Sequence, residues 1–372
     1  IQARRMIGPK AYIDIGRLKQ NVWNIRRNIG DRNLMIVVKA NGYGHGALHI
    51  AKHLSDEPGI IFCVFTIDEA IELRNGGIKN HILIFSRIQR DWLELAYEHG
   101  LWINACHLDD LELLDHFYND HGYCPNVHLK FDTGMTRLGF DDNDSDKVFS
   151  FLLDRDHLPV IGIYSHFATA DEGDLSYAES QLLKFNKIVE SGRSAKIEFQ
   201  YIHCSNSGAL LNLPSSLFNT VRVGMLAYGI APSDEVTMDI NVEPVMSFCG
   251  PIVNVRRVEP GTQVSYGGVY MTERSTNIGV VQTGFADGFP RPWYKNGHIS
   301  YKGEIYNIAG RVCMDQFMVD FGDMEPRLGD EVLIFGKKDD DHISLESIAK
   351  NIDTTTYVLL TAIQGRTERI TI

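Results

Sequence analysis

The chain has 372 residues, of which 44% are hydrophobic and 23% are charged, a composition typical of a globular protein. Its 36 Lys and Arg against 48 Asp and Glu give a formal net charge of −12, which argues against nucleic acid or an anionic membrane surface as the main partner and leaves a small-molecule substrate open. Because single hydrophobic cores stop growing at roughly 250–300 residues, we expect two domains.

The cysteines and the apolar runs bear on the cellular setting. The six cysteines are scattered and form neither a metal-type pair nor a dense framework, so we expect no metal site and reduced thiols in the cytoplasm. No apolar run approaches the ~18 residues of a transmembrane helix, and no signal peptide is visible. The chain begins with Ile1 instead of Met, from which we expect a processed protein or one domain of a longer one.

The first predicted elements are a short alternating strand at residues 10–15 and an amphipathic helix through about residue 28. Strands and helices then alternate, with helices predicted at residues 67–75, 109–118 and 177–190. The eight predicted strands cover residues 34–38, 60–65, 82–85, 102–105, 126–131, 159–164, 198–203 and 219–223. This rhythm predicts an α/β fold and favours a TIM-like (β/α)8 barrel over the alternative, a doubly wound open sheet.

The pattern changes after about residue 231, where Pro and Gly punctuate short β-branched runs without a long helical period. Such a pattern is typical of consecutive antiparallel strands. We therefore predict a barrel domain at residues 1–235 and a mainly-β domain, here called the β domain, at residues 236–372. The strand at residues 10–15 is expected to join the β domain.

One lysine stands at the end of a predicted buried strand. The segment LMIVVKANGYGHG runs from Leu34 to Gly46, and its apolar run stops at Lys39, before a loop expected to be flexible. Ligands collect at the carboxyl ends of such strands. A lysine among apolar neighbours loses solvation, and its neutral amine can form a Schiff base with an aldehyde. A solvated lysine at the strand end is the alternative that this segment leaves open.

The motif VVKANGYGHG closely resembles the cofactor-lysine signature of the alanine racemase family, fold-type III enzymes that use pyridoxal 5′-phosphate (PLP). Further matches follow in the family's order through Tyr357, so the resemblance covers nearly the whole chain. It implies an N-terminal barrel, a C-terminal β domain, PLP linked to Lys39, and interconversion of L- and D-alanine, which supplies D-amino acid for peptidoglycan.

Polar residues also follow two further predicted strands, and the resemblance implies that they contact the cofactor. In HLKFDTGMTRLGF, Arg137 follows a strand that ends at Asp132, and in IYSHFATAD His166 ends the next strand. Alone, they could be a surface arginine and a structural histidine. The resemblance implies that Arg137 binds the cofactor's phenolic oxygen and places the substrate carboxylate, that a carbamylated Lys130 holds Arg137, and that His166 lies against the pyridine ring.

The last two barrel strands end in small and polar residues, in the sector where barrels commonly build a phosphate site. Small residues let backbone N–H groups approach a phosphate. The resemblance implies that Arg222 faces the pyridine nitrogen; since arginine keeps its proton, the cofactor is then a weaker electron sink, which favours racemisation over transamination. The residues implied at the phosphate end of the cofactor are Tyr43, Asn206, Ser207, Gly224, Met225 and Tyr357.

The β domain is expected to supply the second base. Racemisation needs proton transfer on both faces of the α-carbon, and one lysine covers one face. The resemblance implies that Tyr266, in VSYGGVY, reaches into the partner's site, exchanging the proton on the L side while Lys39 acts on the D side. It therefore implies a homodimer with shared sites.

Other matches in the β domain concern substrate binding and the entrance to the active site, here called the gate. In AGRVCMDQF the backbone N–H of Met314 would bind the substrate carboxylate in the partner's site, with Arg311 and Asp315 supporting the entrance. In GFADGFPR, Phe285 stands where the family usually has tyrosine, so hydrogen bonding at the gate is expected to differ.

The sequence leaves several functions open. A tight pocket discriminates by about 1–3 kcal/mol per methylene and rejects an added hydroxyl poorly, so serine or both amino acids could be substrates. The start at Ile1 and the presence of Phe285 leave open that the chain is the serine or alanine racemase domain of a vancomycin-resistance-type membrane protein. Such a domain would lie on the cytoplasmic side. A non-catalytic PLP-binding protein is disfavoured by Tyr266, and a fold-type III decarboxylase by Arg222.

Overall fold

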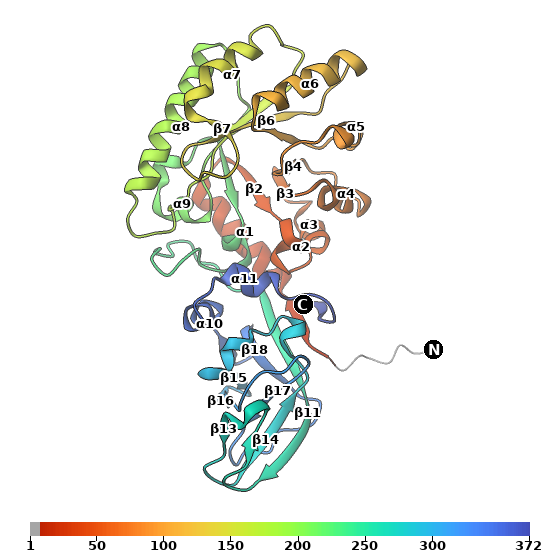
Figure 1. Ribbon diagram of the computed structural model, residues 1–372, viewed down its shortest axis with the longest axis vertical. Helices are drawn as coiled ribbons and strands as arrows, with labels where there is room; N and C mark the ends of the chain where they lie inside the picture. The colour runs from red at the N-terminus through yellow and green to blue at the C-terminus, as the bar shows by residue number, and fades with distance from the viewer. Residues whose placement is uncertain (1–7) are drawn as a thin grey trace.

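The computed structural model describes residues 8–372, which form a barrel joined end to end with a region rich in antiparallel strands (Figure 1). Within these residues, eight mostly buried parallel strands pair in the orders β10-β2-β3-β4 and β5-β6-β8-β9. A bridge between Leu83 and Trp102 joins β4 to β5, and the hydrogen bond from Ile202 N to Asn219 Oδ1 (2.8 Å) joins β9 to the segment before β10. The predicted (β/α)8 barrel is thereby confirmed. Its strands are β2 (Asn33–Val37), β3 (Ile60–Val64), β4 (Ile82–Ile84), β5 (Ile103–Ala105), β6 (Val127–Asp132), β8 (Val160–Tyr164), β9 (Tyr201–His203) and β10 (Thr220–Val223).

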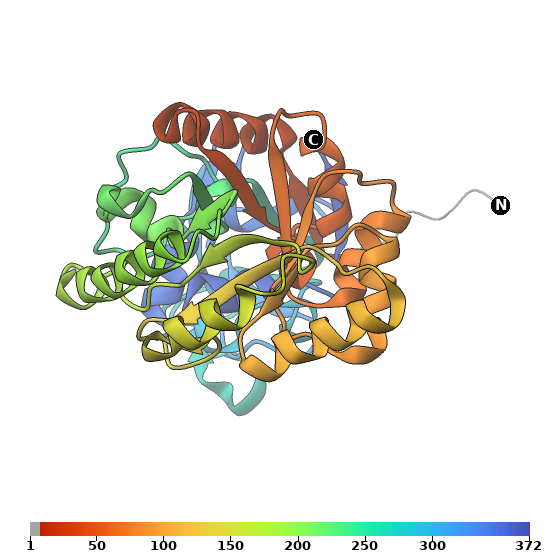
Figure 2. The ribbon, with the colours of Figure 1, turned by 90° about the horizontal axis from the view of Figure 1, so that it is seen from above.

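Helices surround the barrel strands, as the view from above shows (Figure 2). The first, α1 (Ile15–Ile29), begins at Asp14, whose side chain accepts a hydrogen bond from Arg17 N (2.9 Å), and it buries Leu18, Val22 and Ile25 at helical spacing. The helices predicted at residues 67–75, 109–118 and 177–190 are present, the last two longer than predicted. The remaining barrel helices are α3 (Ala47–Leu54), α4 (Ile67–Asn75), α5 (Leu93–Glu98), α6 (Leu108–His121), α7 (Ser145–Leu152), α8 (Ser176–Ser194) and α9 (Ser207–Asn212).

The β domain contains a nine-stranded sheet in the order β19-β18-β15-β16-β17-β14-β11-β1-β20. The first strand among the described residues, β1 (Lys10–Ile13), lies inside this sheet, antiparallel to β11 (Met246–Val258) and parallel to β20 (Glu368–Thr371). The boundary near residue 235 stays a prediction. The other strands are β14 (Thr276–Val281), β15 (His298–Tyr301), β16 (Glu304–Ile308), β17 (Phe317–Asp320), β18 (Glu331–Lys338) and β19 (Asp341–Ile343).

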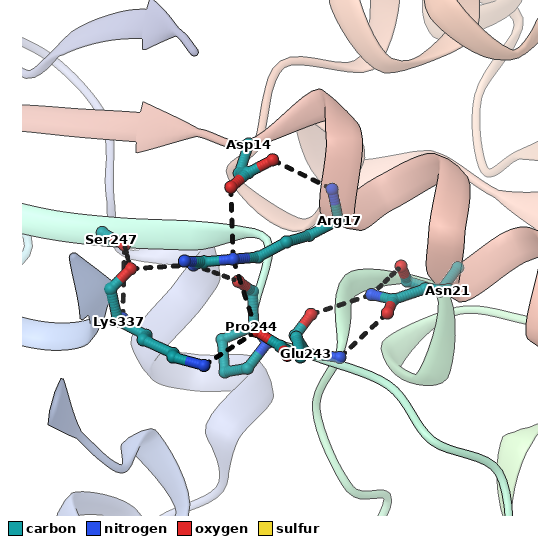
Figure 3. Close-up of polar contacts among 8 residues, drawn as sticks. Asp14, Arg17, Asn21, Glu243, Pro244, Ser247 and Lys337 are labelled. Atoms are coloured by element: carbon teal, nitrogen blue, oxygen red, sulfur yellow. Dashed lines mark hydrogen bonds and ion pairs between the residues drawn. The ribbon is translucent and has the colours of Figure 1, made fainter. Parts of the chain in front are cut away.

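A polar network fixes the barrel to the β domain (Figure 3). On α1, Arg17 Nη1 donates to Lys337 O (2.8 Å) and to Pro244 O (3.2 Å). Asn21 Nδ2 donates to Glu243 O and Asn21 Oδ1 accepts from Glu243 N, both at 2.8 Å. Lys337 Nζ pairs with Glu243 Oε2 at 3.0 Å. Two residues one helical turn apart therefore hold both the segment before β11 and the strand β18.

In the described chain, no helix combines the length and the apolar character that crossing a bilayer requires.

Two short helices of the β domain, α10 (Leu345–Asn351) and α11 (Thr356–Thr361), lie at the junction with the barrel (Figure 1). The helix α11 contacts the segment that follows β2. The carboxyl ends of the barrel strands therefore face the β domain, and a site there can draw on both.

An ion cluster ties β1 to β18. The Glu331 carboxylate accepts hydrogen bonds from Lys10 Nζ (2.6 Å), Tyr12 Oη (2.7 Å) and Lys338 Nζ (2.9 Å). Burial raises the pKa of Glu331, but these hydrogen bonds outweigh burial and lower the pKa to about 2. Since the carboxylate is more acidic in the folded chain than unfolded, its contribution to stability is complete above about pH 4.5 and is lost as the pH falls toward 2.

Replacing this carboxylate should destabilise the sheet in a pH-dependent way. We expect Glu331→Gln to lower the free energy of unfolding by about 2–3 kcal/mol at pH 7, because three partly buried hydrogen bonds lose their charged acceptor. Urea unfolding between pH 7 and 3 measures the difference from wild type, which should shrink below pH 4.5. Glu325→Gln, at an exposed position of the same domain, should change little. A difference that is the same at every pH would contradict this account.

Candidate active site

The chain turns in an unusual conformation directly after β2. Lys39 opens the short segment α2 (Lys39–Tyr43), in which Ala40, Asn41, Gly42 and Tyr43 have φ of 51°, 54°, 62° and 49°. Each non-glycine residue in this left-handed region costs roughly 1–2 kcal/mol, so surrounding contacts must hold the turn. In place of the flexible loop expected here, the structure shows a tight left-handed turn that begins at Lys39.

The carboxyl ends of the barrel strands enclose a cavity of about 830 Å³. Its wall comes from the ends of β2, β6, β8 and β10, from the segments that follow these strands and β3, β4 and β9, and from α11 of the β domain. Many site residues predicted from the sequence line this one cavity, namely Lys39, Tyr43, Lys130, Arg137, His166, Asn206, Ser207, Arg222, Gly224, Met225 and Tyr357. The structure thus brings together residues that are up to 318 positions apart.

A buried guanidinium organises the centre of the cavity wall. Arg222, 4% exposed, donates from Nη1 to His203 Nδ1 (2.6 Å) and from Nη2 to Ser165 O (2.8 Å) and His166 Nδ1 (3.1 Å). Burial and the charge of Arg222 hold the pKa of both histidines well below the usual range, so both rings are neutral. Because Arg222 donates to His203 Nδ1, the proton of that ring lies on Nε2, which is 3.0 Å from His128 Nδ1.

Two lysines in the wall of this cavity, Lys39 and Lys130, have lowered pKa values. Burial, followed by the nearby charge of Arg137, lowers the pKa of Lys39. The same two causes, again in that order, lower the pKa of Lys130 to about 8. The loop that carries Arg137 is fixed by Asp132, whose Oδ2 accepts from Arg137 N (2.7 Å) and whose Oδ1 accepts from Gly134 N (2.9 Å). Both shifts favour the neutral amine, the form that acts as a nucleophile or base, relative to a solvated lysine.

One end of the cavity is shaped to admit an anion. Ser207 Oγ lies within hydrogen-bond distance of Gly224 N (3.2 Å) and Leu226 N (3.5 Å). A Cβ at Gly224 would lie 2.9 Å from Tyr43 Oη, so a side chain here would displace the Tyr43 ring. The rings of Tyr43 and Tyr357 stand 6.0 Å apart, and the Tyr357 ring comes from the β domain. Hydroxyls and backbone N–H groups are the donors that a phosphate needs, and they converge here.

Apart from Tyr357, the site residues predicted in the β domain do not line this cavity. Tyr266 and Met314 are 68% and 57% exposed, and Phe285 is 40% exposed. They form a second group on the surface of the β domain: Phe285 N donates to Cys313 O (3.2 Å), and Ser265 Oγ, next to Tyr266, donates to Arg311 O (2.6 Å). The remaining member, Asp315, pairs with Arg366 at 2.7 Å. Within one chain, the predicted site residues thus fall into two separate groups.

Among the cavity residues that were not predicted from the sequence, three are titratable: Arg87, Tyr164 and Asp171. Tyr164, at the end of β8, is 2% exposed, lines the cavity, and its hydroxyl is without a hydrogen-bond partner among the described residues. Arg87 is held by Asp110 at 2.8 Å, and Asp171 lies by Gly208, where a Cβ would be 2.7 Å from the Asp171 Cβ. A signal existed only for Tyr164 and Asp171, which flank His166 in the strand-end segment IYSHFATAD.

Comparison with known families gives two matches that together cover most of the chain. The profile described as "Alanine racemase, N-terminal domain" matches residues 13–232, and that described as "Alanine racemase, C-terminal domain" matches residues 245–371. Among curated proteins, the alanine racemase of Desulforamulus reducens is 35% identical over 364 residues, covering 97% of this chain and 98% of that protein. Alanine racemase 1 of Bacillus subtilis is also 35% identical, covering 97% of this chain and 92% of that protein.

Solved structures agree with these matches. Alanine racemase from Clostridium difficile 630 superposes with a TM-score of 0.92 at 32% identity, covering 99% of this chain and 97% of that one. Alanine racemase from Bacillus anthracis, determined with bound L-Ala-P, superposes with a TM-score of 0.89 at 30% identity, covering 100% of this chain and 96% of that one. The similarity therefore extends over both the barrel and the β domain.

Proposed function

The chain belongs to the alanine racemase family, and on this premise we propose that it interconverts L- and D-alanine with Lys39 and Tyr266 as opposed bases. The enzyme is an isomerase whose product supplies D-alanine for peptidoglycan, and its family uses PLP. The observation that carries the residue assignment is the single cavity in which Lys39, Arg222 and the phosphate-type donors meet.

The donors in the cavity fit this cofactor. Ser207, Gly224 and Tyr43 would hold its phosphate, with Asn206, Met225 and Tyr357 completing that end. Arg222 would lie at the pyridine nitrogen and His166 against the ring. When bound, PLP supplies the electron sink that makes the α-proton of an amino acid acidic.

The chain's own groups would then move the proton. Lys39 Nζ, whose pKa burial and Arg137 lower, would hold its proton less tightly than a solvated lysine and would act on the D side. Tyr266 Oη would act on the L side. Arg137 would orient the substrate carboxylate, together with the backbone N–H of Met314.

Because Tyr266 and Met314 project from the surface of the β domain, we propose a homodimer in which each β domain completes the partner's cavity. In that arrangement Phe285, Arg311 and Asp315 would border the entrance. Phe285 brings no hydroxyl to this gate, so access there would depend on packing and not on a hydrogen bond.

Lys130 is proposed to be carbamylated. Carbamate formation requires a neutral amine, and the pKa of about 8 leaves roughly a tenth of the Lys130 amine neutral at pH 7. A carbamate there would turn a buried positive charge beside Arg137 into a negative one and so hold the guanidinium in place. The six free thiols, five of them buried, support the further proposal of a cytoplasmic location.

Proton exchange at the α-carbon in deuterated buffer tests the function. Purified, PLP-loaded protein is incubated with L-alanine or with L-serine, and deuterium uptake and optical inversion are followed together. We expect exchange with inversion and a higher rate for alanine. A higher rate for serine would move the assignment to a serine racemase, and the absence of exchange with either would contradict racemase activity.

A further inference from the structure

The left-handed turn after Lys39 is held by contacts at both ends. At its far end, Asn41 Oδ1 accepts a hydrogen bond from Ala47 N (2.9 Å), and Arg369 Nε donates to Gly44 O (2.7 Å). At its near end, Ala40 N donates to Glu69 Oε1 at 2.7 Å. The peptide that directly follows Lys39 is thus fixed by a carboxylate from another element, the helix α4.

Glu69 also closes the start of its own helix. Its Oε2 accepts from Phe65 N (2.7 Å) and Thr66 N (3.2 Å), and Thr66 Oγ1 in return accepts from Glu69 N (3.2 Å), which is a capping box. One carboxylate therefore joins three backbone N–H groups from the ends of two neighbouring parallel strands, β2 and β3. With both oxygens engaged, the side chain has a single position.

The carboxylate also acts on the lysine electrostatically. Arg137 and Arg222, from the barrel strands β6 and β10 and their loops, disfavour a proton on Lys39, whereas Glu69 favours one and Cys63 would do so only as a thiolate. Burial raises the pKa of the Cys63 thiol to about 12, so that residue is uncharged near neutral pH. His166 faces the same amine and is neutral. Glu69 is thus the negative charge that offsets the two arginines.

We propose that Glu69 is a positioning residue for Lys39: its carboxylate fixes the peptide that follows the lysine and supplies the negative charge that offsets Arg137. This inference rests on the proposed role of Lys39 as a base. Without the carboxylate, the turn would relax toward less strained conformations and the amine would release its proton more readily. A base that gives up its proton too easily also takes one too weakly, so proton abstraction would slow.

The variant Glu69→Gln separates this role from helix capping, because glutamine still completes a capping box after Thr66. Glu72→Gln, at an exposed position of the same helix, is the matched control with the same change in charge. Acetylation of the Lys39 amine in the full-length chain, before cofactor is added, is followed by peptide mass spectrometry across a pH series. Thermal unfolding reports whether each variant folds.

In Glu69→Gln we expect the labelling midpoint of Lys39 to fall by on the order of 1 pH unit, with the wild-type midpoint kept in Glu72→Gln. After PLP is added, kcat for alanine should fall roughly tenfold, since the Lys39 base is displaced. KM should stay within about twofold, since the contacts to the substrate carboxylate remain. A Lys39 midpoint unchanged from wild type would overturn the proposal. A wild-type chain that labels normally but does not racemise alanine would instead contradict the proposed function.

Discussion

Replacing Lys39 by alanine is expected to reduce racemisation of alanine at least ~10⁴-fold, because one substitution removes both the cofactor's covalent attachment and one of the two bases. The fold should persist, since Lys39 stands after β2 and the buried run of that strand is untouched. Racemisation is measured by circular dichroism of alanine, and attachment by cofactor that stays with the chain after borohydride reduction.

Lys52→Ala provides the control, because this exposed lysine lies on the nearby helix α3 and should affect neither measurement. We expect wild type and Lys52→Ala to retain reduced cofactor on a peptide containing Lys39. Cofactor found on any other lysine, or a Lys39→Ala enzyme with more than a hundredth of the wild-type rate, would contradict the assignment.

Tyr266→Phe should lower racemisation by about 10²–10⁴-fold while cofactor attachment stays intact, since only the phenolic proton carrier is lost. The exposed position of Tyr266 on the β domain makes a folding defect unexpected. Tyr97→Phe, an exposed tyrosine on the barrel helix α5, serves as the control and should keep the wild-type rate.

Mixing the two inactive variants tests whether sites are shared. In a mixed dimer, the cavity with an intact Lys39 would receive Tyr266 from the other subunit, so one of the two sites is complete. With random exchange of subunits, roughly a quarter of the wild-type activity should return. If the mixture stays as inactive as its components although subunit exchange is demonstrated, the shared-site arrangement is wrong.

Barrel strands such as β2, β3 and β4 were predictable because each contains a short apolar run between turn residues, the pattern of strands buried on both faces. The left-handed turn after Lys39 was not, since Asn41 and Gly42 tolerate positive φ but Ala40 and Tyr43 give no local signal for it. The contacts that hold the turn include one with Glu69 of α4 and one with Arg369 near the C-terminus, and sequence patterns do not report such distant contacts.

Contacts between distant segments also limited what could be predicted about the site. The resemblance predicted residues that do line one cavity, but the role of Glu69 was missed. The pattern Thr66-x-x-Glu69 predicts a helix cap, whereas the second hydrogen bond, to Ala40 N, exists only because β2 and β3 lie side by side. Tyr266 illustrates the opposite case, since its role was inferred from resemblance and depends on a second chain.

The place of β1 in the β-domain sheet has a consequence for how the chain is synthesised. Lys10 pairs with Cys249 on one side and with Glu368 on the other, so β1 leaves the ribosome long before either of the strands that flank it. The barrel, whose contacts lie between, can form earlier. We therefore expect nascent chains that lack β20 to expose an unpaired edge of β1, and such edges promote aggregation. One edge of β1 is thus covered only after β20 has been synthesised.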